Sequence, residues 1–414
     1  MVWHHKRGGF GTARALAADR AGHVYVYDAG QGNTVYRLNA ELGAFDNFPD
    51  AGSAEFSLDR FKLGLAKRMR YEDGRLEFVF EKEILSIAVG DLKDVKRWPA
   101  TESDLRIAAG GGAGSAAFIA TGDPDHQISV VKNGEKIRSI GRKGGRRLEG
   151  KWDREGFYNI AGLALDDKGF LWVAESDALP RRFSKWNAAT GEFVAEFFGS
   201  TVYGALGGAI LAGDPKTMIG QGLEWKLDGK NLRAEPVGYV SRKVAWGNSR
   251  TGVGKNGHDY AAIGGWWMMK ESSPVKIFER IEPGVWKHRA TLTLVGKGYK
   301  VWSDENGDEI EQPEEIHDYS AADLKGWING WYMPMAQNLS FFSGAYVLSV
   351  TGWTRCGAPL YDFTRYVPLP ANVVKGGCGR GGMGAGNGIA SEDGKFAVYN
   401  AQYNTKWSYS PLYE

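Results

Sequence analysis

The chain has 414 residues, with 51 Lys plus Arg against 49 Asp plus Glu and a formal net charge of +2. This balance lacks the cationic surplus by which proteins coat nucleic acid, so no nucleic-acid partner is expected. With 58 glycines, 15 tryptophans and 43% hydrophobic residues, the chain is not disordered; its composition predicts an all-β protein of short strands and tight turns.

The N-terminal sequence MVWHHKRGGFG lacks the apolar core of a signal peptide. No apolar run reaches the roughly 18 residues of a transmembrane helix, so no membrane span is predicted. The chain is therefore expected to be cytosolic, to have lost a leader, or to be a piece of a longer protein.

A repeated pattern begins in residues 15–38, ALAADRAGHVYVYDAGQGNTVYRL. An apolar strand leads into a turn with Asp and Gly, and two alternating strands follow around a second turn. Residues 161–186, AGLALDDKGFLWVAESDALPRRFSKW, repeat this pattern, and residues 388–400 carry its first half. Gly supplies the positive φ of a tight hairpin and Asp binds turn amides. The predicted turn pairs are Asp19 with Gly22, Asp167 with Gly169, and Asp393 with Gly394.

Weaker copies are predicted between these segments, in residues 76–89, 116–137, 218–240, 263–294 and 327–350. Their spacing of roughly 45 to 65 residues suits a four-stranded propeller blade. We therefore expect one β-propeller over residues 1–414. Seven blades are predicted if the first and last units combine to close the ring, with six or eight as alternatives.

The two best copies resemble NHL-type repeats: an apolar strand, a D-x-x-G or D-D-x-G turn, then (I/L/V)-(Y/W)-V-(A/Y)-(D/E). The chain as a whole resembles the propeller part of large bacterial extracytoplasmic proteins with degenerate NHL repeats. The resemblance implies an NHL-type propeller in an extracytoplasmic or secreted protein. NHL-type propellers include ligand-binding scaffolds, peptide-processing lyases and metal-dependent lactonase-like hydrolases. The final KWSYSPLYE ends within a strand-like pattern, which is typical of a fragment.

The tripeptide His-Asp-Tyr occurs twice, about one repeat apart. Equivalent positions of neighbouring blades lie at equivalent radial positions, so two His-Asp pairs could face one central tunnel. There they could hold a metal, act as acid and base, or activate water. The alternative is structural: Asp caps a turn, His binds a carbonyl and Tyr packs between blades. The candidate catalytic residues are His258, Asp259, His317 and Asp318.

Residues 302–315, WSDENGDEIEQPEE, resemble an EF-hand or dockerin-like calcium loop. Calcium takes six to eight oxygen ligands, which alternating carboxylates and amides on a tight loop supply. Glu309 stands where the pattern has Gly, and Glu311 where it has an apolar residue. The alternative is an acidic exposed insertion in a blade; bound calcium would stiffen the loop. The candidate ligands are Asp304, Asn306, Asp308 and Glu315.

Aromatic residues concentrate in the later repeats. Flat exposed rings stack on sugar faces or organic cations. The alternative is that they fill the wedges between blades. The candidate ligand-binding residues are Trp266, Trp267, Trp327, Trp331 and Tyr332.

Two further features have structural and functional alternatives. The basic run 142–147, RKGGRR, is expected to be a solvated loop, with anion or acidic-glycan binding as the alternative. Cys356 and Cys378 are expected to be free thiols, or to form a disulfide in an oxidising compartment.

Two functions remain open from the sequence. The first is a monomeric module that binds a carbohydrate, small-molecule or protein ligand, with calcium as a structural ion. The second is a metal-assisted hydrolase acting on an ester, lactone, phosphotriester or glycosidic bond at the tunnel. The binding module is preferred, because no catalytic signature is specific.

Overall fold

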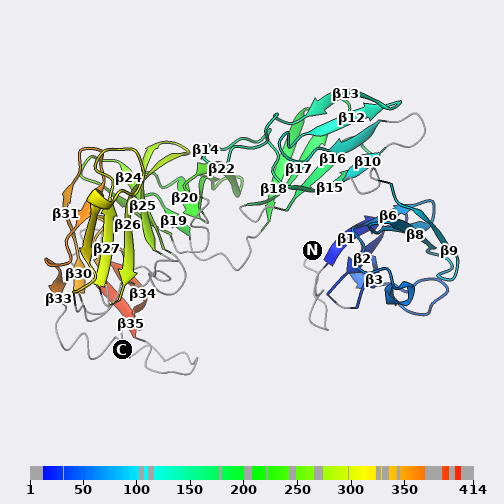
Figure 1. Cartoon of the computed structure of the whole chain (residues 1–414), viewed down its shortest axis with the longest axis horizontal. Helices are drawn as coiled ribbons and strands as arrows, with labels where there is room; N and C mark the ends of the chain where they lie inside the picture. Colours follow the sequence, from blue (N-terminus) through cyan, green and yellow to red (C-terminus); the bar gives the residue numbers. More distant parts are fainter. Residues whose placement is uncertain are drawn as a thin grey trace. The chain divides into compact units, whose positions relative to one another are not determined.

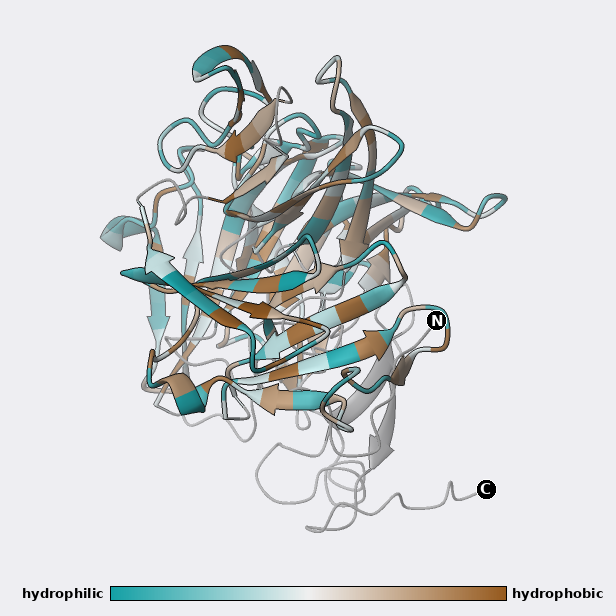
Figure 2. Cartoon of the chain, turned by 90° about the vertical axis from the view of Figure 1, so that its right-hand side faces the viewer, coloured by the Kyte–Doolittle hydropathy of each residue, from teal (hydrophilic) through white to brown (hydrophobic). Residues whose placement is uncertain are grey.

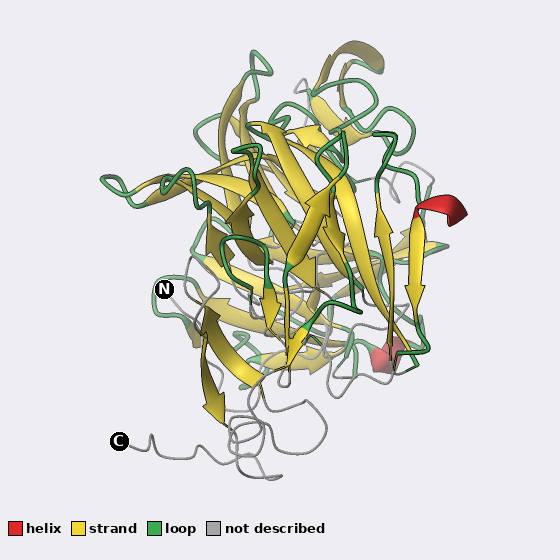
Figure 3. Cartoon of the chain, turned by 90° about the vertical axis from the view of Figure 1, so that its left-hand side faces the viewer, coloured by secondary structure: helices red, strands yellow, loops and turns green. Residues whose placement is uncertain are grey.

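The computed structural model describes residues 13–30, 32–101, 107–110, 116–176, 180–199, 208–220, 222–241, 249–264, 274–296, 298–322, 328, 335–342, 346–368, 385–390 and 397–401. They belong to two compact units, Met1–Ala120 with Val130–Glu135, and Thr121–Ser129 with Lys136–Glu414 (Figure 1). Regular structure in these residues is β-strand, apart from the 3-10 turns Asp59–Phe61 and Pro313–Glu315 (Figure 3). No helix among them is long and apolar enough to cross a membrane.

Four-stranded sheets recur along the chain, each with its strands side by side in chain order. The first sheet is β1 (Ala13–Ala18), β2 (His23–Asp28), β3 (Thr34–Asn39) and β4 (Ala44–Phe45), with β5 (Glu55–Ser57) also paired to β3. The second is β6 (Arg68–Glu72), β7 (Arg75–Val79), β8 (Glu83–Ala88) and β9 (Val95–Pro99). The third is β10 (Ala108–Gly110), β11 (Ala117–Ala120), β12 (Ile128–Lys132) and β13 (Glu135–Ile140). The fourth is β15 (Ile160–Leu165), β16 (Phe170–Glu175), β17 (Arg181–Asn187) and β18 (Phe193–Gly199).

Two further meanders share an eleven-stranded sheet. One is β19 (Gly208–Ile210), β20 (Thr217–Gly220), β21 (Leu223–Asp228) and β22 (Arg233–Tyr239), with β14 (Gly150–Lys151) on β22. The other is β23 (Ser249–Val253), β24 (Asp259–Gly264), β25 (Val275–Glu282), β26 (Val285–Val295), β27 (Gly298–Ser303) and β28 (Ile316–Tyr319). The last strands are β29 (Phe341–Phe342), β30 (Tyr346–Leu348), β31 (Val350–Trp353), β32 (Pro359–Tyr361), β33 (Val367–Pro368), β34 (Ala385–Ala390) and β35 (Ala397–Ala401).

The all-β prediction is confirmed. A four-stranded meander that recurs along the chain is the blade of a β-propeller. Hydrophobic and hydrophilic residues alternate along the strands nearest the viewer in Figure 2, as expected where successive side chains point to opposite faces. The number of blades and the NHL type of the repeats stay predictions.

The two best sequence repeats fold into the same local structure. Asp19 accepts hydrogen bonds from the amides of Ala21 and His23, and its Oδ2 accepts one from the Tyr25 hydroxyl at 2.9 Å. In the fourth sheet, Asp166 accepts hydrogen bonds from the amides two and four residues later, and its Oδ2 accepts one from the Trp172 indole at 2.9 Å. Each carboxylate thus ties its hairpin turn to the aromatic side chain six positions further on.

The turn of the second copy differs from the prediction by one residue. The sequence paired Asp167 with Gly169, but the structure uses Asp166, which lies three residues before that glycine as Asp19 does before Gly22. Asp167 is exposed. Only the carboxylate at the start of the turn faces the amides that follow, and the sequence Asp-Asp does not show which of the two it is.

The sheet of β23–β28 is covered on both faces. On one face, Ile277 and Leu292 belong to a buried cluster with Phe341 and Tyr361 of the last strands. On the other, Ile263 and Phe278 pack with Leu211, Ile219 and Val240 from the meander of β19–β22. Face-to-face packing of successive sheets is the way in which blades bury their surfaces.

Replacing Asp166 with Ala should lower the melting temperature by a few degrees, because two amides and an indole lose their shared acceptor. Asp167→Ala is the matched control and should leave the melting temperature unchanged. Thermal unfolding followed by circular dichroism at neutral pH measures both. Equal losses in the two variants would contradict the assigned turn.

The contribution of Asp166 to stability should depend on pH. Hydrogen bonds from the Trp172 indole and then the Phe170 amide hold the pKa of Asp166 below its usual value. A folded-state pKa below the unfolded one adds stability above the unfolded value of about 3.9, and this is lost as the pH falls further. The difference between wild type and Asp166→Ala should therefore shrink when melting is repeated near pH 3.

Candidate functional site

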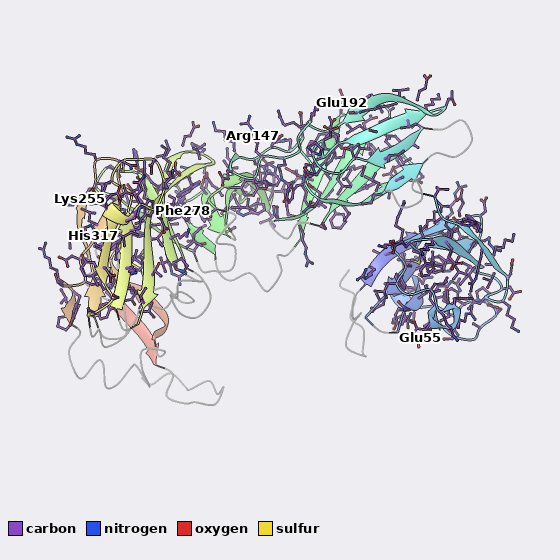
Figure 4. All side chains as sticks on the ribbon, in the orientation of Figure 1. Glu55, Arg147, Glu192, Lys255, Phe278 and His317 are labelled. Atoms are coloured by element: carbon purple, nitrogen blue, oxygen red, sulfur yellow. The ribbon has the colours of Figure 1, made fainter. Side chains whose placement is uncertain are left out.

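The two His-Asp-Tyr tripeptides lie on one sheet but on strands that are not neighbours. His258 directly precedes β24, whereas His317 and Asp318 lie on β28, with β25, β26 and β27 between them (Figure 4). Four strand steps of about 4.8 Å separate them by roughly 19 Å across the sheet. The register also sets His317 level with Gly264, six residues further along the strand than His258. The structure therefore does not bring the two His-Asp pairs together around one ion.

Two of the four candidate catalytic residues, Asp259 and Asp318, make local contacts. Asp259 accepts a hydrogen bond from the Gly213 amide at 3.0 Å and lies 3.9 Å from Arg280. Asp318 is exposed and lies 3.7 Å from Lys300, and His317 is exposed as well. Asp259 thereby lies at the edge of the Arg280–Glu224 pair, whereas His258 belongs to a second polar network.

A buried carboxylate holds the His258 ring. Its Nδ1 lies 2.7 Å from Oε1 of Glu279, whose side chain is 3% exposed, while the His258 side chain is 49% exposed. The same oxygen accepts a hydrogen bond from Asn256 at 2.8 Å, and Oε2 accepts one from Arg289 at 2.7 Å. No hydrogen bond from Nε2 of His258 occurs within the described residues. An imidazole fixed at one nitrogen and open at the other can take up or release a proton toward a ligand.

Arg289 connects this histidine to the acidic loop. Its Nη1 donates to Oδ2 of Asp304 at 2.7 Å, and the other oxygen of Asp304 accepts a hydrogen bond from the Gly307 amide. Burial alone would lower the pKa of Arg289, but its hydrogen bonds to Glu279 and Asp304 outweigh burial and raise it. His258 and Asp304, which the sequence assigned to two separate sites, are therefore two ends of one network.

The four predicted calcium ligands already meet donors from the protein. Asp304 binds Arg289, and the buried Glu315 accepts hydrogen bonds from the Trp302 indole and a loop amide. Asn306 and Asp308 accept hydrogen bonds from amides within the loop. In the part of the chain that the structure describes, no three His, Cys, Asp or Glu side chains gather in an arrangement suited to a metal ion. Calcium binding by this loop stays a prediction.

A second hairpin turn brings Cys356 to the network. Its Sγ donates to the carbonyl oxygen of Asp304 at 2.8 Å. The next residue, Gly357, has φ of +92°, and a Cβ there would lie 2.9 Å from Oε1 of Glu279, so only glycine fits. Cys356 forms no disulfide within the described residues, and Cys378 lies outside them, so the choice between two free thiols and a disulfide stays open.

This second turn repeats the one that carries His258. Residues 251–257 and 351–357 both read Thr-Gly-x-x-(Lys/Arg)-x-Gly; Lys255, labelled in Figure 4, marks the first. The amide of Gly254 donates to the carbonyl of His258, and the amide of Thr354 donates to that of Ala358. The shared motif is a sequence signal that could have paired the two turns. Glu279 and Arg289 carry no such signal, because each is one of several charged or basic residues on its strand and nothing local distinguishes it.

The predicted ligand-binding aromatic residues cannot be placed. Trp266, Trp267, Trp327, Trp331 and Tyr332 lie outside the described residues. Their role as a binding surface stays a prediction.

A hollow of about 660 Å³ opens beside the fourth sheet. The turn between β17 and β18 forms one wall, and the segment 141–155 forms another. Gly141, with φ of +86°, allows the close approach of the Phe157 ring, which packs on Trp186 with ring centroids 4.9 Å apart. Glu192 is labelled in Figure 4. The hollow is lined by Gly141, Arg142, Arg154, Glu155, Trp186, Gly191, Glu192 and Phe193.

A buried ion network fixes the segment that forms this hollow. Glu175 accepts hydrogen bonds from Arg146 at 3.2 Å and from Arg182 at 3.0 Å, and all three side chains are fully buried. The Arg146 guanidinium also lies 4.6 Å from the Trp152 ring centroid. Burial would lower the pKa of Arg146, but the charge of Glu175 helps to raise it. The prediction that the run RKGGRR is a solvated loop is therefore wrong for Arg146. Its guanidinium is buried, and the buried Glu175 carboxylate balances its charge.

Comparison with known proteins leaves the family open. No family model and no curated protein sequence matches the chain. Similar solved structures include Kuenenia stuttgartiensis hydrazine synthase, at 13% identity and a TM-score of 0.25, covering 95% of both chains. A nidogen/laminin complex has 14% identity and a TM-score of 0.27, covering 54% of this chain and 79% of that one. A Bacteroides caccae protein of unknown function has 12% identity and a TM-score of 0.24, covering 45% of this chain and 60% of that one. TM-scores this low carry no argument, so the fold rests on the strands of the chain itself.

Replacing Glu279 with Gln should lower the free energy of unfolding by about 3 kcal/mol, because the buried Arg289 loses a charged partner. The control is Glu282→Gln, on the same strand as Glu279. Glu282 forms an exposed ion pair with Lys151 of β14, so this variant should lower the free energy of unfolding by less than about 0.5 kcal/mol. Urea unfolding measures both. Equal effects would show that the network is not the stabilising element described here.

Proposed function

We propose that the chain is a β-propeller module that binds a glycan or protein ligand without transforming it. The observation that carries this proposal is the hollow beside the fourth sheet. Its volume lies within the range of about 300–1,000 Å³ typical of ligand sites. It offers two guanidiniums, two carboxylates and two aromatic rings, and its lining residues include no His, Ser, Thr or Cys.

The proposal includes the finer expectations from the sequence. The module acts as a monomer, belongs to an extracytoplasmic bacterial protein as the NHL resemblance implies, and carries calcium on the loop 302–315. None of these is needed for a ligand to occupy the hollow.

Binding is tested on an array of immobilised oligosaccharides. Wild type should bind at least one glycan class, and Phe193→Ala and Arg154→Ala should each weaken that binding about tenfold or more, since each removes a contact group from the hollow. Val194→Ala, at the exposed next position of β18, is the matched control. Absence of binding, or equal binding by all variants, would sink the glycan form of the proposal.

A hydrolase is the second candidate function, and the pairing of His258 with the buried Glu279 is the observation that favours it. A carboxylate behind an imidazole fixes its tautomer and stabilises its charged form during proton transfer. His258 would then act as general base or acid through Nε2.

Turnover of an ester, a lactone, a phosphotriester and a glycoside tests this candidate. His258→Ala should abolish turnover while leaving the melting temperature close to wild type, and Lys255→Ala in the same exposed turn should have no effect. His317→Ala, on β28, should keep full activity, and a loss of turnover in that variant as well would contradict the assignment of the chemistry to His258. If wild type turns over none of the four substrates, the hydrolase candidate is removed.

A further inference from the structure

The charges of the residues that line the hollow sum to zero, and the partner of one of them, Asp153, adds a single negative charge. Two guanidiniums, of Arg142 and Arg154, face two carboxylates, of Glu155 and Glu192. Arg142 is already paired with Asp153, which lies just behind the lining. Any surplus of charge is therefore one negative unit, so the hollow holds no field that would attract an acidic ligand.

The basic run that suggested an acidic-glycan site does not supply free cations to this hollow. Arg142 is bound to Asp153, and Arg146 is bound to Glu175 in the interior. An acidic sugar would also have to approach Glu155 and Glu192, whose like charges oppose it. The structure therefore removes the physical basis for that alternative at this site.

The remaining groups match an uncharged ring that bears hydroxyls. Guanidiniums only donate hydrogen bonds and carboxylates only accept them, whereas a sugar hydroxyl does both. The half-buried Phe193 ring supplies an apolar surface. The Trp186 ring stands at 83° to it with centroids 5.4 Å apart, and the Arg154 guanidinium lies 5.7 Å from the Phe193 centroid, so the aromatic and the donor groups adjoin. An aromatic surface next to charged hydrogen-bonding groups suits the apolar face and polar rim of a pyranose.

The walls of the hollow are held before any ligand arrives. The β17–β18 turn is closed by Asn187, whose Oδ1 accepts hydrogen bonds from the amides of Ala189 and Thr190. Arg138 donates to the carbonyls of Ala188 and Ala189. On the other wall, the buried Arg182 donates to the Arg154 carbonyl. Because this backbone is already ordered, ligand binding costs little conformational entropy here.

We infer that the hollow binds an uncharged pyranose unit of a neutral glycan, an inference that rests on the proposed binding function. Phe193 packs against the sugar face. Arg154 donates to ring hydroxyls, and Glu155 and Glu192 accept hydrogen bonds from them.

Titration calorimetry with three oligosaccharides of equal length tests this inference: a neutral β-glucan, an oligogalacturonate and an oligoglucosamine. The neutral glucan should bind most tightly. Its affinity should change less than about twofold between roughly 50 and 500 mM NaCl, because no net charge is neutralised on binding. Phe193→Ala should weaken it about tenfold or more. Arg154→Ala, at an exposed side chain, should weaken it too, while Val194→Ala should not; melting temperatures confirm that the variants are folded.

The outcomes separate the inference from the function on which it rests. Tighter, salt-sensitive binding of the galacturonate or glucosamine oligomer, lost in Phe193→Ala, would overturn the neutral ligand but keep the binding module. Neutral-glucan binding that survives both Phe193→Ala and Arg154→Ala would overturn the location. Failure of all three oligomers together with an empty glycan array would overturn both.

Discussion

A carboxylate that leaves water must be paired, and this constraint organises the second unit of the chain. Removing an ion from water costs several kcal/mol, which only close opposite charges and hydrogen bonds offset. Glu175, Glu224 and Glu279 are each buried within a strand and each bind an arginine: Glu175 binds Arg146 and Arg182, Glu224 binds Arg280, and Glu279 binds Arg289. Glu224 also accepts hydrogen bonds from the Gly284 amide and the Trp286 indole. Apolar side chains alone would tolerate a shift in the pairing of the strands. The buried carboxylates and arginines lie within hydrogen-bond distance in only one register.

Both candidate sites depend on such a pair. One carboxylate oxygen of Glu279 binds the ring of the exposed His258, and the other accepts a hydrogen bond from Arg289. Arg289 also donates to Asp304, at the start of the acidic loop. Beside the fourth sheet, Glu175 and Arg182 fix the segment that ends at the hollow, so that Arg154 and Phe193 present their side chains from rigid backbone. The side chains of each site are held in place before a ligand binds. Binding therefore costs little conformational entropy.

The repeated turns show how local and distant interactions combine. Asp19 and Asp166 bind amides within four residues, so the conformation of these turns depends on local sequence. The turns that contain His258 and Cys356 share a local motif as well, yet their contacts differ. Asn256 and His258 bind Glu279, while Cys356 binds the Asp304 carbonyl. The same backbone turn thus serves two different polar environments in one neighbourhood.

The all-β class, the repeated strand pattern and its Asp-Gly turns could be predicted from the sequence, because period-two alternation and turn chemistry act over a few residues. The sequence also marked His258 and Asp304 as polar residues of interest. It could not join them, since Glu279 and Arg289 look no different in sequence from the other charged residues of β25 and β26, and only the pairing of those strands brings them together. Nor could it distinguish Asp166 from Asp167, or a solvated Arg146 from a buried one, because burial and pairing depend on residues distant in sequence. Which charges are paired is visible only in the tertiary structure, because the partners lie far apart in sequence. The charges that remain unpaired are the ones that can bind a ligand.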